Sequence, residues 1–164
     1  QPAVRRPDNT ALSDFERKQF EATLTARRDV PTYCVDEPYN TIVLRHPDGG
    51  GWLVWLLEPM TKADTYPIAG HWRYLISDDG KSITRRDRLG NSCLSMAKEA
   101  DTAALMVGNV VSQAPLETHV FTNYAAKLDL YVVTGEDGLW RIHDGRISAV
   151  DPKTMQGAEE PERR

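Results

Sequence analysis

Residues 70–89, GHWRYLISDDGKSITRRDRL, decide the predicted fold because they are typical of a single β-hairpin. Asp79-Gly80 lies between two runs of strand-forming residues. An Asp-Gly pair favours a two-residue type I′ turn, in which both central residues take a positive φ. A turn of this length fixes the register of the two strands, so we expect Ile76 opposite Ile83 and the remaining pairs in step with them.

In that register the hairpin has one apolar face and one basic face, because strand side chains alternate between the two sides of a sheet. The apolar face is expected to pack in the core and consists of Trp72, Tyr74, Ile76 and Ile83. The basic face consists of His71, Arg73, Arg86 and Arg88. These four residues are the candidate binding residues of the chain.

Arg73 and Arg86 are expected directly opposite each other, where like charges destabilise a sheet. A compensating negative charge is therefore expected nearby. Carboxylates elsewhere in the chain are one explanation, since surface charge networks are common. A small anionic ligand or an acidic partner protein is the other, because arginine pairs well with carboxylate and phosphate groups.

Composition limits the class of protein. A chain of 164 residues with 40% hydrophobic and 27% charged residues can bury a core and is typical of a globular protein. Its formal net charge of -4 argues against a general nucleic-acid binder. No apolar run reaches the roughly 20 residues of a membrane-spanning helix, so no membrane span is expected.

The chain is expected to form a single α+β domain over residues 10–150, between a disordered lead (1–9) and a disordered, charged tail (151–164). The lead begins at Gln1 without a visible signal peptide, which is typical of an exported chain whose signal has been removed, or of a trimmed chain. A periplasmic or secreted location is therefore one expectation.

The expected architecture is an antiparallel β-meander with two helices. The sequence Ser13-Asp14-Phe15-Glu16 predicts a capping box at the start of the first helix, which Pro31 ends. Alanines and valines at helical spacing predict a second helix near residues 98–112, although its valines and Gly108 leave a strand at 105–112 as an alternative. The remaining strands are expected at 41–46, 52–58, 118–124, 128–134, 139–143 and 146–150. Strands and helices do not alternate in this pattern, so no parallel pairing is expected.

The two cysteines, Cys34 and Cys93, leave three possibilities open. They could form a disulfide, remain as two thiols, or contribute to a metal site together with histidines. A disulfide would place the protein in an oxidising compartment.

Motifs that carry chemistry are absent from the sequence. It contains no phosphate-binding loop, no GxGxxG, no GxSxG and no HExxH, and its histidines lack the spacing of a metal site. We therefore predict no catalytic residue, no cofactor and no metal. The alternative is a small hydrolase-like enzyme in which His71, His119 and Glu117 converge only in the folded chain.

Four runs resemble a group of small, exported proteobacterial proteins of unassigned activity: Gly70–Tyr74, Ser92–Leu94, Pro115–Phe121 and Leu139–Ile142. The resemblance covers roughly residues 50–150 of the sequence. It implies a periplasmic setting and supports a bridge between Cys34 and Cys93, but it implies no catalytic residue. The prediction for function is thus a non-enzymatic exported domain that binds a protein or small anionic ligand through its basic sheet face.

Overall fold

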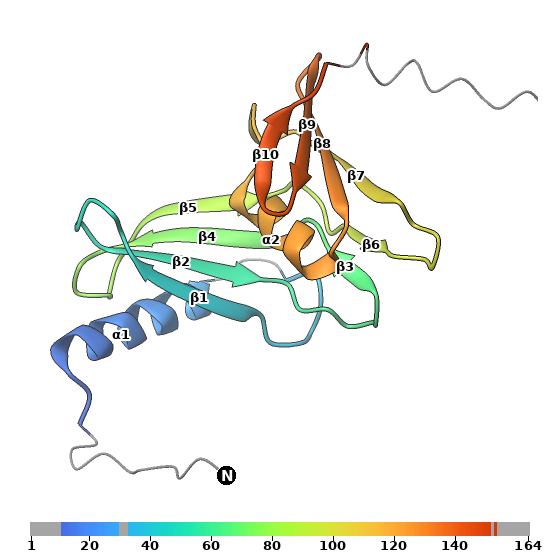
Figure 1. Cartoon of the computed structure of the whole chain (residues 1–164). Coiled ribbons are helices and arrows are strands. Elements are labelled where there is room, and N and C mark those ends of the chain that lie inside the picture. Colours follow the sequence, from blue (N-terminus) through green and yellow to red (C-terminus); the bar gives the residue numbers. More distant parts are fainter. Residues whose placement is uncertain (1–10, 30–32, 152, 154–164) are drawn as a thin grey trace, which may run out of the picture.

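The structure, a computed structural model, describes residues 11–29, 33–151 and 153. The described residues form two helices and ten strands, mostly in antiparallel sheets, which confirms the predicted α+β class (Figure 1). The predicted disordered lead (1–9) and nearly all of the predicted disordered tail (151–164) lie outside the described residues.

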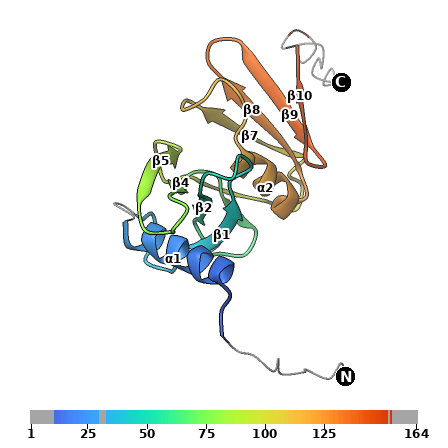
Figure 2. The ribbon, with the colours of Figure 1, turned by 90° about the vertical axis from the view of Figure 1, so that its left-hand side faces the viewer.

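The first sheet has the strand order β1-β2-β4-β5 and is antiparallel throughout. Its strands are β1 (Asn40–Arg45), β2 (Trp52–Leu57), β4 (His71–Ile76) and β5 (Ile83–Leu89). Helix α1 (Asp14–Asp29) packs on one face of this sheet, and α2 (Glu117–Ala126) lies on the other (Figures 1 and 2). We refer to these two sides as the α1 face and the α2 face.

The capping box predicted for α1 is confirmed. The backbone N–H of Ser13 donates to Glu16 Oε2 at 2.8 Å, and the backbone N–H of Glu16 donates to Ser13 Oγ at 3.3 Å. Two of the four N–H groups that a helix start leaves unpaired are thereby satisfied.

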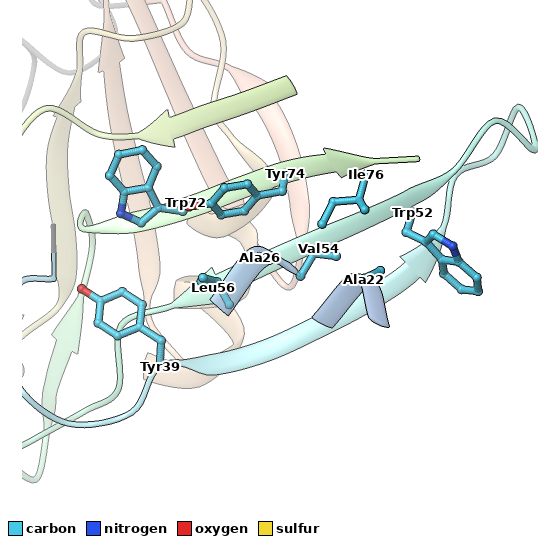
Figure 3. Packing of buried hydrophobic residues seen from close by; sticks show 9 residues of the cluster. All are labelled: Ala22, Ala26, Tyr39, Trp52, Val54, Leu56, Trp72, Tyr74 and Ile76. Carbon is cyan, nitrogen blue, oxygen red and sulfur yellow. The ribbon is translucent and has the colours of Figure 1, made fainter. Parts of the chain in front are cut away.

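The core between α1 and the first sheet is built from small residues on the helix and large ones on the strands. Ala22 and Ala26 are fully buried, so the helix backbone lies close to the sheet (Figure 3). The strands contribute aromatic and branched side chains to this cluster, as Figure 3 shows: Trp52, Val54, Leu56, Trp72, Tyr74 and Ile76. Trp72, Tyr74 and Ile76 therefore face the core, as predicted.

The turn of the predicted hairpin is longer than expected. Gly80 has a positive φ of 79°, but Asp79 does not, so the turn is not type I′. Instead the N–H of Gly80 donates to the carbonyl of Ser77, and the N–H of Ser77 pairs with the carbonyl of Ser82. The Asp79 carboxylate stabilises this longer turn by accepting bonds from the Ser77 hydroxyl and the N–H of Lys81.

The predicted register is correct at the turn and wrong beyond it. Ile76 lies opposite Ile83, but Leu75 lies opposite Arg85, so Thr84 is an extra residue that forms a β-bulge. From there to the end of the strand every pair is displaced by one residue, and Arg73 faces Asp87 rather than Arg86. The predicted juxtaposition of two arginines does not occur.

A second sheet has the order β10-β9-β8-β7, and its strands β7 (Ala104–Asn109) and β8 (Asp129–Thr134) pair in parallel. Helix α2 connects them, so β7-α2-β8 is a βαβ unit, and the prediction that no strands pair in parallel is wrong. The second helix exists, but it lies at Glu117–Ala126 and not near residues 98–112, where the alternative of a strand was correct.

The predicted strand at 118–124 is wrong, because these residues belong to α2. Two local bonds explain why they are helical. The N–H of Leu116, just before the helix, donates to His119 Nδ1 at 3.0 Å, so this backbone group has a partner. The hydroxyl of Thr122 donates to the carbonyl of Thr118. Threonine fits a helix interior when its hydroxyl bonds a carbonyl one turn back.

The last hairpin is confirmed in detail. Strands β9 (Gly138–His143) and β10 (Arg146–Ala149) pair with Ile142 opposite Ile147, as predicted. Asp144 and Gly145 both have positive φ, 47° and 73°, as a type I′ turn requires. Two further short strands, β3 (Thr65–Pro67) and β6 (Ser95–Ala97), form a small sheet that was not predicted.

Cys34 and Cys93 form a disulfide, with their Cα atoms 5.5 Å apart. The bridge joins the connector between α1 and β1 to the loop that follows β5. Neither of the two described helices is long and apolar enough to cross a membrane.

Candidate interaction surface

Strand β1 is one edge of the first sheet, and its margin is open in the part of the chain that the structure describes. β1 pairs with β2 on one side, and no described strand pairs with it on the other (Figure 1). Its sequence, NTIVLR, contains no proline or lysine and ends on one arginine. Natural edge strands usually carry such residues to prevent pairing with other chains, so β1 is an unprotected edge.

The backbone of β1 offers hydrogen-bonding groups along this edge. The N–H of His46 donates inward to the carbonyl of Gly51 across the β1–β2 turn. Along an antiparallel strand, successive residues point their N–H and C=O groups alternately toward and away from the neighbouring strand. The backbone groups of Thr41 and Val43 therefore point away from β2, toward the open edge. The carbonyl of Val43 accepts a bond from the side chain of Gln19 on α1 at 3.3 Å, so a flexible side chain occupies the place of a strand partner.

On the α2 face, the edge borders a groove of about 260 Å³ that is almost entirely apolar. Ile42 and Leu44 of β1 form one wall and are 39% and 54% exposed. Phe121 of α2, 50% exposed, forms the opposite wall. The remaining lining residues are Trp55, Leu57, Glu117 and Thr118.

On the α1 face, the same edge borders a second groove, of about 400 Å³. Thr41 and Val43 of β1 line it on one side, and Phe20 of α1, which is 53% exposed, lines it on the other. Successive residues of β1 therefore open into two grooves on opposite faces. We call β1 together with these two grooves the β1 edge surface.

The opposite edge of the first sheet is protected. Strand β5 carries Arg85, Arg86 and Arg88, and charged side chains on an edge disfavour the addition of another strand. The contrast makes β1 the edge of this sheet that is suited to pairing.

The four residues predicted to form one basic face are divided between the two faces of the sheet. The bulge at Thr84 places Arg86 and Arg88 opposite Tyr74 and Trp72 on the α1 face, whereas His71 and Arg73 remain on the α2 face. The expectation of a single basic face is therefore wrong, because one extra residue exchanges the faces of all residues after it.

Each of the two central arginines has carboxylate partners within the chain. Arg73 donates to Asp87 at 3.0 Å and to Glu117 at 2.7 Å. Arg86 binds both oxygens of Asp29, at the end of α1. The guanidinium of Arg88 lies 5.8 Å from the ring of Trp72, in a cation–π contact. Carboxylates within the chain thus supply the negative charge that was expected near these arginines, while the anionic ligand stays an untested prediction.

Glu117, the first residue of α2, forms hydrogen bonds with side chains on the α2 face of the first sheet. Its Oε1 accepts bonds from Trp55 Nε1 and Arg73 Nη1, both at 2.7 Å. Burial acts to raise the pKa of Glu117, but the bonds from Trp55 and Arg73 outweigh it and hold the pKa below its usual value. The charged Glu117 is thus one of the residues that line the otherwise apolar groove.

The residues of the enzymatic alternative are His71, His119 and Glu117. His71 and His119 are buried, and each uses Nδ1 to accept a backbone N–H, from Glu58 and Leu116 respectively. Burial lowers the pKa of each to about 4, so both imidazoles are neutral near neutral pH. His119 borders a cavity of about 30 Å³ that neither His71 nor Glu117 lines.

A pairing that the sequence analysis missed is that of His143 with Asp129. Nδ1 of His143 lies 2.6 Å from Asp129 Oδ1, and Arg141 binds the other oxygen of the same carboxylate. The pairing of β8 with β9 brings these residues together, so the strands predicted at 128–134 and 139–143 contained the signal. The neighbouring depression of about 390 Å³ is polar, and none of the residues that line it is a serine or a cysteine.

Within the residues that the structure describes, no group of three or more histidine, cysteine, aspartate or glutamate side chains is arranged to hold a metal ion. Comparison of the chain with protein-family models, with curated proteins and with solved structures finds no match. The resemblance to exported proteobacterial proteins stays a prediction.

Proposed function

We propose that this protein is a non-enzymatic interaction domain that binds an extended segment of a partner protein as an added strand at the β1 edge surface. The observation that carries the proposal is the coincidence of an unprotected strand edge with a groove on each of its faces, of which the groove on the α2 face is almost entirely apolar. An added strand would replace the Gln19 side chain at the carbonyl of Val43 and form backbone bonds with Thr41 and Val43, and its alternate side chains would enter the two grooves.

The chemistry of the partner segment follows from the grooves. Side chains that enter the α2 face would meet Ile42, Leu44 and Phe121, so apolar residues are favoured there. Side chains that enter the other groove would meet Phe20 beside Gln19 and Thr23, which favours apolar or small polar residues. We therefore propose a segment with apolar residues at every second position.

The disulfide supports a location in an oxidising compartment, as expected for an exported protein. A periplasmic or secreted location is part of this proposal, because disulfides persist there and are rare in the cytosol of most cells.

The test is selection of a displayed random-peptide library on the purified protein, followed by binding measurements with the selected peptides. We expect peptides with apolar residues at alternate positions. The substitution Leu44→Lys should weaken their binding at least about tenfold, because it places a charge in the groove and on the edge.

Ile147→Lys is the matched control, since Ile147 is exposed to a similar extent as Leu44 and lies on β10, one of the two edge strands of the second sheet. It should leave binding unchanged. Equal effects of both substitutions, or selected peptides without alternation, would contradict the proposal. If sedimentation shows that the unmodified chain dimerises and Leu44→Lys makes it monomeric, the occupant is a second copy of the chain and the proposed partner is wrong.

A further inference from the structure

We propose that the Cys34–Cys93 disulfide is a site of thiol–disulfide exchange, in which Glu58 donates a proton to the sulfur of Cys34 as an incoming thiolate attacks the sulfur of Cys93. This site is separate from the β1 edge surface and does not depend on the function proposed above.

Gly70 brings the carboxyl group of Glu58 to the disulfide. A Cβ atom on Gly70 would lie 2.2 Å from Glu58 Oε2 and 2.7 Å from Cys34 Sγ, which are closer than atoms can approach. Both atoms therefore occupy the space that any side chain at position 70 would need. Glu58 Oε2 and Cys34 Sγ are therefore close to each other, because both lie next to this one point.

One oxygen of the Glu58 carboxyl group is buried without a hydrogen-bond partner among the described residues. The residue is only 8% exposed, and the oxygen without a partner is Oε2. A buried, unpaired carboxyl group is costly, and such groups are retained mainly where they have a function. The oxygen that lacks a partner is the same one that lies beside the disulfide.

Burial favours the protonated form of the Glu58 carboxyl group. It raises the pKa of Glu58, and no lysine or arginine among the described residues acts to lower it. A carboxylic acid that stays protonated closer to neutral pH is suited to proton donation.

The two sulfurs differ in access. Cys93 is exposed and lies in the loop after β5, whereas Cys34 is half-buried against Glu58. An external thiolate can thus reach Cys93, and Cys34 becomes the leaving group next to the acid. Exchange proceeds faster as the leaving thiolate is stabilised, and protonation removes its charge.

The exchange consists of two displacements. The thiolate of a dithiol co-reactant forms a bond to Cys93 Sγ, and the bond between the two cysteine sulfurs breaks with its electron pair going to Cys34. Glu58 gives its proton to Cys34, which becomes a thiol, and Glu58 becomes a carboxylate. The second thiolate of the dithiol then attacks the mixed disulfide, which releases Cys93 as a thiolate and the co-reactant as a cyclic disulfide.

The test is the rate at which dithiothreitol reduces the disulfide in the folded protein, followed by rapid alkylation and mass measurement. The rate is divided by the fraction of reagent present as thiolate, from mildly acidic to mildly alkaline pH. We expect this corrected rate to fall as pH rises and Glu58 ionises. In Glu58→Gln, which keeps the shape but has no acidic proton, it should be independent of pH.

The rates measured at acidic pH distinguish proton donation by Glu58 from repulsion of the incoming thiolate by its negative charge. Below the titration of Glu58 the unmodified protein should react at least about tenfold faster than Glu58→Gln, at the lower end of general acid catalysis. If Glu58→Gln reacts as fast or faster at every pH, Glu58 only repels the thiolate and the proposal is wrong. Asp36→Asn, an exposed acid on the same connector as Cys34, is the matched control and should behave as the unmodified protein.

If Glu58→Gln does not fold, the dependence of the corrected rate on pH in the unmodified protein still tests the proposal. A corrected rate that does not change with pH in the unmodified protein would overturn the proposal without any substitution.

Discussion

The guanidinium of Arg73 donates from Nε and Nη2 to Oδ2 of Asp87, its partner across β4 and β5, at 3.1 and 3.0 Å. The pair is mostly buried, with 27% and 22% of the two side chains exposed. An arginine and an aspartate therefore meet at the place where two arginines were predicted. The bulge at Thr84 produces this pairing.

We predict that Asp87→Asn lowers the free energy of unfolding by about 1 to 2 kcal/mol, because it leaves Arg73 with Glu117 as its remaining charged partner. Burial acts to raise the pKa of Asp87, but bonds from Arg85 and Arg73 lower it below its usual value. The stability that the charged Asp87 contributes is thus fully present above the pKa of Asp87 in the unfolded chain. It is lost as pH falls through the pKa of Asp87 in the folded protein. Urea unfolding at neutral pH measures the effect, and Asp14→Asn, whose ion pair with Arg17 lies in solvent, should have a much smaller one.

We predict that Gly70→Ala destabilises the fold by at least about 2 kcal/mol, because position 70 has a positive φ of 87° and its Cβ would collide with Glu58 and Cys34. Gly50→Ala is the matched control. Gly50 has no neighbour within 4 Å of its Cβ position and no positive φ, so its substitution should be close to neutral. Thermal melts of both variants decide the point, and similar melting temperatures would contradict the prediction.

We predict that replacing both cysteines by serine lowers stability by about 4 kcal/mol in the chain-entropy treatment, because the bridge spans 59 positions of the sequence. The denaturant midpoint of the double variant should match that of the reduced protein. If reduction has no effect on the midpoint, the disulfide does not constrain the unfolded chain in the expected way.

We predict that stability falls on acidification between about pH 6.5 and pH 4, the unfolded and folded pKa values of His71 and His119. In this range the unfolded chain binds protons that the buried imidazoles do not, which costs up to about 3 kcal/mol for each histidine. Glu58 acts in the opposite direction: its pKa is raised by burial, so its contribution is lost as pH rises through the folded value.

Urea unfolding of His119→Gln across this range tests the assignment. The glutamine side chain would retain an acceptor for the N–H of Leu116 but would not titrate, so the dependence of stability on pH should be shallower by up to about 1.4 kcal/mol per pH unit. An unchanged slope would mean that His119 does not contribute to it.

The two hairpins show how far local sequence determines structure here. Asp144-Gly145 forms the type I′ turn that its sequence predicts, with the predicted pairs. Asp79-Gly80 does not, because Ser77 and Asp79 offer side-chain bonds that favour a longer turn. The two turns contain the same Asp-Gly pair, which has the same preference for a type I′ turn. The neighbouring polar side chains therefore determine which type of turn forms.

After residue 97 the structure has a strand where a helix was predicted and a helix where a strand was predicted, and the cause is a tertiary contact. Residues 104–109 pair in parallel with β8, and this pairing requires the helical crossover that α2 provides. Single-sequence periodicity does not contain that long-range requirement. The β1 edge surface is beyond prediction for the same reason, since Phe20 and Phe121 come from helices on opposite faces of the sheet.

The extra residue at Thr84 has a consequence for how related chains can differ. Deleting it would move Arg86 and Arg88 to the α2 face and Asp87 to the α1 face, so a change of length by one position would alter more contacts than any single replacement in the strand. Selection should consequently act on the number of amino acids between the turn and Leu89 more strictly than on their identity, and insertions among homologues should fall in the preceding loop.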